Sequence, residues 1–215
     1  VWIFGGDGWA YDIGFGGLDH VLASGHNVNV MVFDTEMYSN TGGQASKASN
    51  IGEVCQFAAA GKDIGKKSLA EIAMSYGYVY VAQIALGANM AQAVKVLAEA
   101  EAYNGPSLII GYAPCELHGV KGGMNHCQDE MKKAVAAGYW NLFSFNPALK
   151  AEGKNPFTLT SKPGDGTYQE FLNNETRYSR LTRSFPERAA KLFAASEEAA
   201  KARYEHLQRL VELYK

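Results

Sequence analysis

The sequence is poor in the features that mark secreted, membrane-spanning and nucleic-acid-binding proteins. Its 215 residues include only three cysteines, an odd and scattered set, which excludes a disulfide framework and favours a reducing compartment. No apolar run approaches the roughly 20 residues that a membrane-spanning helix needs. Twenty basic against 22 acidic residues give a net charge of −2, so binding to nucleic acid through bulk positive charge is not expected.

Arginine is missing from the first 150 residues, which carry nine lysines and 13 acidic residues. Residues 151–215 hold all six arginines, together with five lysines and nine acidic residues. Any chemistry in the first 150 residues is therefore expected to work without a guanidinium group. Positive charge there must come from lysine, from backbone N–H groups or from a bound metal ion.

The chain has no initiating methionine and no basic leader segment at its start. It opens on the apolar run Val1-Trp2-Ile3-Phe4, which is typical of a buried strand. Because it starts within a strand and without a signal peptide, we expect the chain to be part of a longer protein.

Short apolar runs alternate with helical stretches along the first 112 residues, a pattern typical of βαβ units and a parallel sheet. A hydrophobic content of 47% with 20% charged residues excludes extensive disorder. The predicted strands span residues 1–5, 28–34, 78–84 and 107–112, and the predicted helices span residues 10–24, 66–77, 89–103 and 124–138. The first and last of these strands are almost continuously apolar, as expected when helices cover both faces of the sheet. The sequence therefore predicts an α/β fold, with a mostly parallel sheet flanked by helices.

The character of the sequence changes after about residue 145, where turn signals precede a long helical stretch. Ser184 and Glu187 have the spacing of a capping box, with Ser184 as the N-cap and Glu187 at the third helical position. Apolar residues recur along this stretch at three- and four-residue spacing, which predicts one buried helical face. We expect residues 1–145 to form an α/β domain and residues 146–215 to form a largely helical C-terminal extension, packed on the core or on another subunit.

Two motifs follow the first two predicted strands. Gly6-Asp7-Gly8 comes after the first strand, and the segment 34–43, Asp-Thr-Glu-Met-Tyr-Ser-Asn-Thr-Gly-Gly, comes after the second. A helical crossover between parallel strands brings their carboxyl ends to the same edge of the sheet, where open α/β sheets bind ligands. Asp7 and Thr35, 28 residues apart, are therefore expected within a few ångströms of each other.

These motifs offer oxygen ligands that suit Mg²⁺. Asp7 supplies a carboxylate, Thr35 a hydroxyl and Met37 a backbone carbonyl, and Mg²⁺ completes its octahedral shell with water and phosphate oxygens. Gly8 permits close approach of the backbone to a phosphate, and a helix that starts near Trp9 points its first N–H groups at the same place. A metal ion and backbone donors would replace the missing arginine in holding a diphosphate.

Other interpretations of these glycine-rich segments are weaker. The Rossmann fingerprint fails because Tyr11 stands where its third glycine should be, and no Walker A motif is present. Gly-Asp-Gly taken alone is more often an ordinary turn, but two such motifs after crossover-linked strands favour a ligand site. The glycine-rich segment 118–123 is predicted either to cover this site or to form plain turns.

A zinc site is the alternative interpretation of the cysteine and histidine residues. Cys115, His118, His126 and Cys127 would be its ligands. Adjacent residues on a helix point about 100° apart, so His126 and Cys127 are poor joint ligands and zinc is disfavoured.

Residues 6–14 and 34–44 together resemble the thiamine-diphosphate motif of the pyruvate:ferredoxin (flavodoxin) oxidoreductases. The resemblance continues through residues 57–62, 76–82 and 112–115, and it covers nearly all of the chain as the carboxyl-terminal part of that large enzyme. It implies the thiamine-diphosphate-binding fold, a mostly parallel sheet flanked by helices, followed by a helical C-terminal extension.

The resemblance also implies the roles of individual residues. Asp7, Thr35 and the carbonyl of Met37 would bind Mg²⁺, and Asn40 would be the catalytic residue that reaches the reacting carbon. The residues that would line thiamine diphosphate are Gly6, Asp7, Gly8, Trp9, Thr35, Glu36, Met37, Tyr38, Ser39 and Asn40. The common form of the motif has asparagine where this chain has Thr35, but a hydroxyl is an equally hard ligand, so the same metal is expected.

The activity implied is the oxidative decarboxylation of pyruvate with coenzyme A to acetyl-CoA and carbon dioxide. Electrons would pass singly through [4Fe–4S] clusters to ferredoxin or flavodoxin. Cys115 would be one ligand of the cluster nearest the cofactor, and the other three would lie upstream of residue 1, because four thiolates are needed. The glutamate that activates the cofactor would also lie in another domain, so the isolated chain is expected to be inactive.

The same resemblance implies a homodimer, the remaining domains of the enzyme as partners, and a cytoplasmic location or, in a eukaryote, an anaerobic organelle. Nucleic acid and membranes are not expected partners. Three alternatives remain open: another thiamine-diphosphate-dependent 2-oxoacid oxidoreductase, a non-oxidative decarboxylase, and a non-catalytic structural module.

Overall fold

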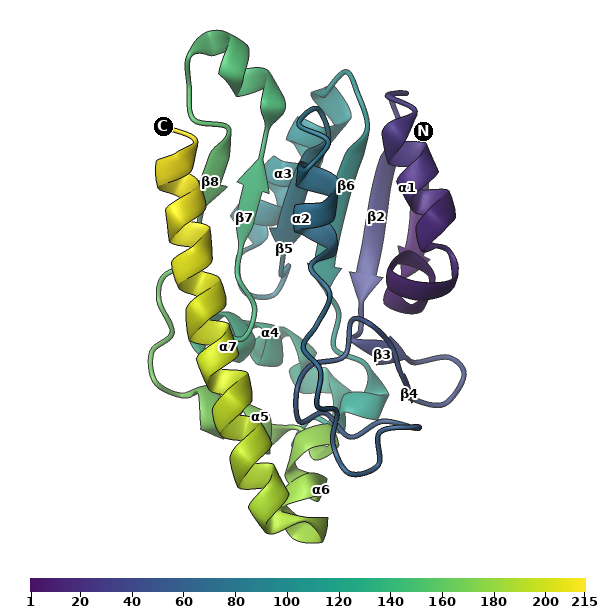
Figure 1. Ribbon diagram of the computed structural model, residues 1–215, viewed down its shortest axis with the longest axis vertical. Coiled ribbons are helices and arrows are strands. Elements are labelled where there is room, and N and C mark those ends of the chain that lie inside the picture. Colours follow the sequence, from purple (N-terminus) through teal and green to yellow (C-terminus); the bar gives the residue numbers. More distant parts are fainter.

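A six-stranded sheet with helices on both faces forms the centre of the computed structural model, which describes residues 1–215 (Figure 1). The strand order is β1-β2-β6-β5-β7-β8. The strands are β1 (Trp2–Gly6), β2 (Asn29–Asp34), β5 (Tyr80–Ile84), β6 (Ser107–Tyr112), β7 (Phe143–Phe145) and β8 (Phe157–Leu159). The first four are parallel, whereas β7 and β8 join the sheet antiparallel. The predicted fold class and its four predicted strands are thus confirmed, and β7 and β8 are additions.

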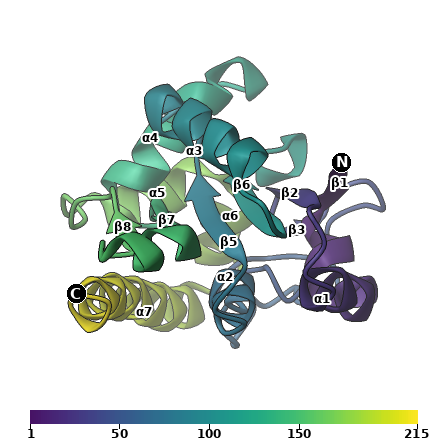
Figure 2. The same ribbon diagram turned by 90° about the horizontal axis from the view of Figure 1, so that it is seen from above.

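The central strands are rich in β-branched and other apolar residues and are buried on both faces. Strand β6 is buried at every position. The edge strand β1 differs, because none of its residues is fully buried and Phe4 is 64% exposed. The expectation that helices cover both faces of the first strand is therefore wrong: α3 does not extend over this edge (Figure 2).

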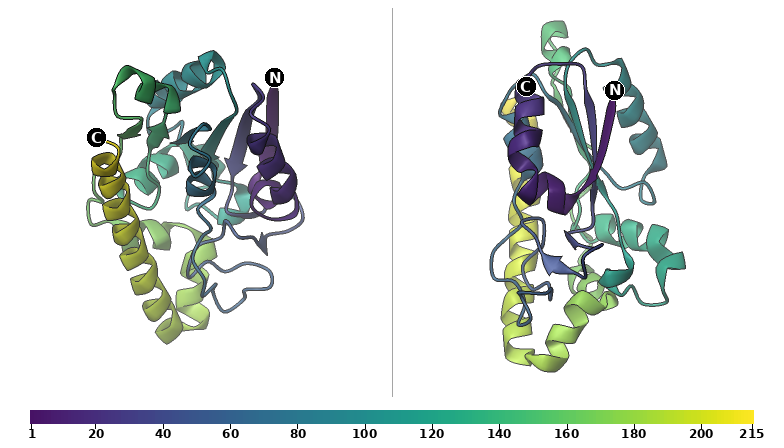
Figure 3. Two further views of the ribbon diagram at one scale, coloured as in Figure 1. Left: turned by 45° about the horizontal axis from the view of Figure 1, so that its top comes forward. Right: turned by 90° about the vertical axis from the view of Figure 1, so that its right-hand side faces the viewer.

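Helices form a layer on each side of the sheet, as Figures 2 and 3 show. One face is covered by α1 (Phe15–Ala23), α2 (Leu69–Met74) and α7 (Pro186–Leu213), and the other by α3 (Met90–Ala102) and α4 (Cys127–Ala136). Helices α5 (Tyr168–Asn174) and α6 (Thr176–Ser184) lie beyond the carboxyl ends of the parallel strands, as does the hairpin of β3 (Met37–Tyr38) and β4 (Gln44–Ala45). The remaining short helices are η1 (Gly8–Ile13), η2 (Glu116–His118), η3 (Met124–His126) and η4 (Pro147–Glu152). No helix combines the length and the apolar character needed to cross a membrane.

The single helix predicted over residues 10–24 is divided in the structure. A π-helical segment, η1, occupies Gly8–Ile13, and α1 begins only at Phe15. The two are separated by Gly14, whose backbone N–H donates to the carbonyl of Trp9. A Cβ at Gly14 would lie 2.1 Å from Cδ1 of Trp9, so the indole packs where a side chain would stand in a continuous helix. The apolar pattern of residues 10–24 did not predict this contact between the Trp9 ring and the Gly14 backbone.

The predicted capping box at Ser184 is also wrong. Ser184 is the last residue of α6, and Phe185 is the only residue between α6 and α7. Helix α7 begins directly with Pro186, whose fixed φ suits the first helical position, and no side chain caps it. The N–H of Ala189 bonds instead to the carbonyl of Phe185.

Helix α7 packs its predicted apolar face against the core of the sheet. Leu192, Phe193 and Leu207 are buried in the same apolar cluster as the strands, and Leu210 packs against its margin. Strand β8 pairs with β7, so the sheet continues into the segment 146–215. The division into two parts near residue 145 stays a prediction.

Replacing Phe193 with alanine is expected to destabilise the chain through loss of this packing. The ring is buried against Tyr178, with their centroids 6.0 Å apart, so Phe193→Ala should cost about 3–5 kcal/mol of unfolding free energy. Leu213→Ala on the same helix is the control, because Leu213 is 73% exposed and its loss should cost less than about 0.5 kcal/mol. Urea unfolding monitored by circular dichroism measures both, and equal effects would contradict the assigned face.

Candidate functional site

The two sequence motifs meet at the carboxyl edge of the sheet. Strands β1 and β2 pair in parallel with Gly6 opposite Phe33, so the residues that follow each strand emerge side by side. The Oγ1 atom of Thr35 lies 2.8 Å from Oδ1 of Asp7 and 2.9 Å from the carbonyl oxygen of Met37. The predicted proximity of Asp7 and Thr35 is confirmed, and the third expected oxygen converges on the same point.

This group of oxygens is compatible with a magnesium ion. It contains one carboxylate, one hydroxyl and one carbonyl, and Mg²⁺ commonly binds through one or two carboxylates with water and phosphate oxygens. No group of three or more histidine, cysteine, aspartate or glutamate side chains is arranged to hold a metal. A magnesium ion here would therefore be bound by the carboxylate, hydroxyl and carbonyl oxygens together with oxygens from a bound phosphate.

The electrostatics of the same region favour a cation. Asp7 is almost completely buried, and burial, followed by the charge of Asp34, raises its pKa to about 6. The hydroxyl of Ser46 donates to Asp7 Oδ2 at 2.9 Å and lowers that pKa in part. The five buried carboxyl groups around the site are Asp7, Asp34, Glu36, Glu53 and Glu175, and the two cationic side chains among them are Lys66 and Arg177. An added positive ion would reduce this excess of buried acid.

An open cleft of about 540 Å³ lies over the converging oxygens. It is lined by Phe4, Gly5, Gly6, Asp7, Gly8, Trp9, Phe33, Thr35, Met37, Tyr38, Ser39, Asn40 and Thr41. All the residues predicted to line a cofactor are present except Glu36. Phe4 and Phe33 were not predicted to line the site; they stack with ring centroids 6.2 Å apart, and both are exposed, although Phe4 belongs to a strand expected to be buried.

Glu36 points away from the cleft. Its side chain is buried beneath the loop, where Oε1 lies 3.0 Å from Lys66 Nζ and Oε2 lies 2.9 Å from Arg177. Burial would raise the pKa of Glu36, but the charges of Lys66 and Arg177 lower it to about 2. The side chain of Glu36 therefore does not line the cleft. That its backbone lines a bound cofactor stays a prediction.

Gly8 has a packing role that the sequence did not predict, and its expected close approach to a phosphate stays a prediction. A Cβ at Gly8 would lie 2.5 Å from Cε1 of Tyr38, so the glycine makes room for this ring. The hydroxyl of Tyr38 donates to the carbonyl of Gly8 at 3.3 Å, which fastens the second motif onto the first. Helix η1 starts at Gly8, so its first backbone N–H groups lie at the cleft.

Cys115 lies on the same edge, beyond the end of β6. Its Sγ is 3.3 Å from the hydroxyl of Ser39 and it forms no disulfide. The other two thiols are elsewhere: Cys55 is buried, which raises its pKa, and Cys127 begins α4. The position of Cys115 near the cleft is as expected, and its role as a cluster ligand stays a prediction.

His118 is buried rather than free to bind zinc. Its Nε2 lies 2.7 Å from the carbonyl oxygen of Thr35, while His126 is largely exposed on the surface. The zinc alternative therefore has no support in the geometry. The segment 118–123 is anchored as well, since the N–H of Thr176 donates to the carbonyl of Gly119 at 3.0 Å.

Arg177 reaches this region from α6. Although the first 150 residues contain no arginine, a guanidinium group from the C-terminal segment therefore lies behind the loop of the candidate site. The guanidinium faces Glu36, Glu53 and Glu175 beneath the loop. Three buried carboxylates need a positive partner, and a side chain 141 residues along the chain from Glu36 provides it. No local sequence signal identifies such a long-range partner.

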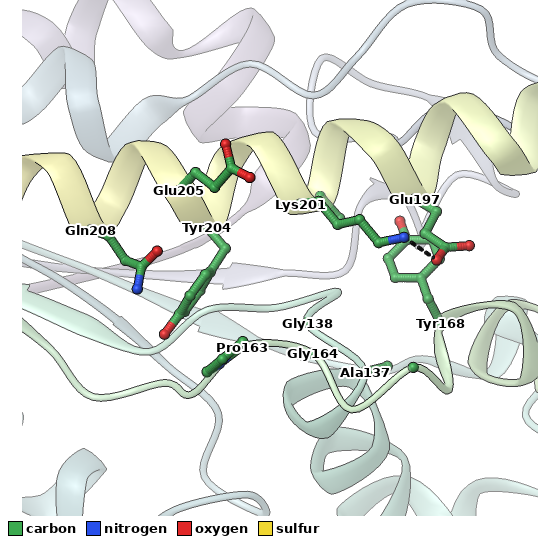
Figure 4. A pocket seen from close by; sticks show the side chains of 12 residues that line it. Ala137, Gly138, Pro163, Gly164, Tyr168, Glu197, Lys201, Tyr204, Glu205 and Gln208 are labelled. Atoms are coloured by element: carbon green, nitrogen blue, oxygen red, sulfur yellow. Dashed lines mark ion pairs between the residues drawn. The ribbon is translucent and has the colours of Figure 1, made fainter.

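A second cavity of about 330 Å³ lies between α7 and the loop around Gly164 (Figure 4). Tyr168, Lys201 and Tyr204 line it, and Lys201 pairs with Glu197 at 2.7 Å on the same helix. None of the predicted site residues lines this cavity. The cleft at the carboxyl edge of the sheet is therefore the candidate site.

Replacing Lys66 with methionine should strongly destabilise the chain. Lys66 lies 2.8 Å from Asp34 and 3.0 Å from Glu36, both fully buried, and losing the charge of one buried partner costs about 3–5 kcal/mol. Lys132→Met is the control, because both partners of the Lys132–Asp129 pair are exposed and the pair should contribute less than about 1 kcal/mol. Urea unfolding at pH 7 compares the two variants. A similar small effect of both would show that Lys66 does not neutralise the buried acids.

Comparison with known proteins is consistent with this geometry. The chain is 59% identical over 212 residues to the pyruvate:ferredoxin oxidoreductase of Moorella thermoacetica and 56% identical over 209 residues to the pyruvate-flavodoxin oxidoreductase of Klebsiella pneumoniae. It is 55% identical over 211 residues to the mitochondrial pyruvate dehydrogenase (NADP+) of Euglena gracilis. These alignments cover 99%, 97% and 98% of this chain but only 18%, 18% and 12% of the relatives.

A solved structure and a family model also match. The 2-oxoglutarate:ferredoxin oxidoreductase from Magnetococcus marinus aligns over 52% of this chain and 38% of its own, with 23% identity and a TM-score of 0.48. Residues 1–110 match the family described as thiamine pyrophosphate enzyme, C-terminal TPP binding domain. These residues are more than half of the chain and contain both motifs of the cleft, so the chain belongs to the thiamine pyrophosphate (thiamine diphosphate) enzyme family and carries its C-terminal cofactor-binding domain.

Proposed function

We propose that this chain is the thiamine-diphosphate-binding part of an enzyme that oxidatively decarboxylates pyruvate with coenzyme A. The products would be acetyl-CoA and carbon dioxide, and electrons would pass through [4Fe–4S] clusters to ferredoxin or flavodoxin. The observation that carries the proposal is the convergence of Asp7, Thr35 and Met37 oxygens beneath an open cleft. The names of relatives that are 56–59% identical support the choice of substrate and electron acceptor.

The chain's own residues would hold the cofactor at one end. Asp7 Oδ1, Thr35 Oγ1 and the Met37 carbonyl would bind Mg²⁺, which would in turn bind the diphosphate oxygens. Thiamine diphosphate supplies a nucleophilic carbon and an electron sink for the decarboxylation of a 2-oxoacid. Asn40 lines the same cleft, and its amide would orient the reacting group of the substrate.

The remaining parts of the site would come from outside this chain. Cys115 would be one thiolate of a [4Fe–4S] cluster, next to Ser39 at the cleft, and the other three thiolates would belong to another segment of the enzyme. Other domains of the same protein, arranged as a homodimer, would supply the group that activates the cofactor. We expect the enzyme to act in the cytoplasm or in an anaerobic organelle, where its free thiols stay reduced.

Magnesium-dependent binding of thiamine diphosphate tests the proposal directly. In the full-length enzyme that contains this chain, stripped of metal, calorimetry should detect thiamine diphosphate binding only after Mg²⁺ is added. Asp7→Ala should abolish this binding, because it removes the only carboxylate of the site. Thr35→Val keeps the shape but loses the hydroxyl ligand and should weaken it markedly, whereas Thr35→Ser should preserve it.

Asp12→Ala provides the control for these variants. Asp12 follows the same motif but pairs with Lys47 outside the cleft, so its loss should leave cofactor binding unchanged. Binding that persists in Asp7→Ala, or that needs no divalent metal, would contradict the proposed site. A full-length enzyme that binds no thiamine diphosphate at all would favour a non-catalytic structural module.

The isolated chain should not catalyse the reaction. Incubated with pyruvate, coenzyme A, Mg²⁺ and thiamine diphosphate, it should fail to reduce a viologen dye, because one cysteine cannot ligate a cluster and the activating group is missing. The full-length enzyme under the same conditions is the positive control. Rapid dye reduction by the isolated chain would show that the catalytic machinery is complete within these residues.

A further inference from the structure

A buried cluster of charges lies directly behind the loop that carries the proposed magnesium ligands. Its centre is Arg177, which is almost completely buried. The guanidinium lies 2.6 Å from Glu175, 2.9 Å from Glu36 and 3.1 Å from Glu53. Because α6 carries Arg177 and β2 leads into Glu36, this cluster ties the helical C-terminal segment to the cofactor loop.

The same cluster reaches the loop by a second route. Nε2 of His118 lies 2.7 Å from the carbonyl oxygen of Thr35, and Nδ1 of His118 lies 3.6 Å from Oε1 of Glu175. Glu175 is in turn paired with Arg177. The Thr35–Glu36 unit is therefore held at its peptide carbonyl by His118 and at its carboxylate by Arg177.

The backbone of Glu36 explains why the loop needs such support. Glu36 has a φ of +63°, in the left-handed region that residues other than glycine seldom adopt. A residue in this conformation persists only when its surroundings hold it there. Its two neighbours, Thr35 and Met37, supply a hydroxyl and a carbonyl to the proposed metal site, so the direction of both oxygens depends on this conformation.

We propose that Arg177 is a positioning residue for the magnesium–thiamine diphosphate site. By holding the carboxylate of Glu36, it keeps the loop in the left-handed turn that aims Thr35 Oγ1 and the Met37 carbonyl at the same point as Asp7. This inference rests on the proposed function, and it assigns to the segment after residue 145 a part in cofactor binding.

The experiment compares metal affinity in variants of the full-length enzyme. Mn²⁺, which is observable by electron paramagnetic resonance, is titrated into apo-enzyme with saturating thiamine diphosphate. Arg177→Lys keeps the charge but loses the planar fork that contacts three carboxylates. Glu36→Gln keeps the shape of the other partner. Each should raise the Mn²⁺ dissociation constant about 10- to 100-fold, the usual effect of disturbing groups behind metal ligands.

Two further readouts separate positioning from a general loss of stability. Excess metal should restore kcat in Arg177→Lys, because the defect lies in metal affinity. Arg188→Lys is the matched control: Arg188 joins α7 to Asp63 and to the carbonyl of Ala60, away from the cleft, so metal affinity should not change. Thermal melting of each apo-enzyme measures stability separately.

The outcomes are distinguishable. Wild-type metal affinity in both Arg177→Lys and Glu36→Gln would overturn the positioning role while leaving the proposed function intact. If Arg177→Lys does not fold, Glu36→Gln alone decides the question, since it removes a buried charge and keeps the side-chain shape. Failure of the wild-type enzyme to bind Mn²⁺ with thiamine diphosphate would overturn the proposed function, and this inference with it.

Discussion

The parallel pairing of β1 with β2 is the constraint on which the site depends. Two strands joined through η1 and α1 must run in the same direction, so Asp7 and Thr35 leave the sheet side by side. Backbone hydrogen bonds hold the strands in register, and hydrogen bonds from the backbone and hydroxyl of Thr35 to Asp7 then join the two loops that follow the strands. The cleft is open because β1 is the edge strand of the sheet and α3 does not extend over it.

Beneath the cleft, the molecule concentrates more acid than base. Burial raises the pKa values of Asp7, Asp34 and Glu53, although Lys66 pairs with Asp34 and Arg177 with Glu53. Arg177 and Lys66 neutralise the inner part of the cluster and face away from the cleft. The outer part, at Asp7, has no cationic side chain within hydrogen-bond distance, and the proposed metal ion would supply the positive charge there.

The helical segments after residue 145 do more than cover the sheet. Helix α7 contributes apolar side chains to the main core, while α6 carries the guanidinium that holds Glu36. The segment after residue 145 therefore contributes both to the apolar core and to the charge cluster behind the loop. The loop that carries Cys115 is also connected to the site, because His118, three residues after Cys115, contacts the carbonyl oxygen of Thr35.

The sequence by itself determined the elements whose causes are local: four apolar strands, the amphipathic face of α7, and the two motifs expected to meet at one edge. Only the tertiary structure decided the features in which packing overrides the local sequence pattern. Trp9 packs on Gly14 where the predicted helix is divided, and Ser184, the predicted cap of the last helix, is instead the final residue of α6. The inward turn of Glu36 and its pairing with Arg177 were likewise invisible, because a buried charge takes its partner from whatever the fold brings near, at any separation along the chain.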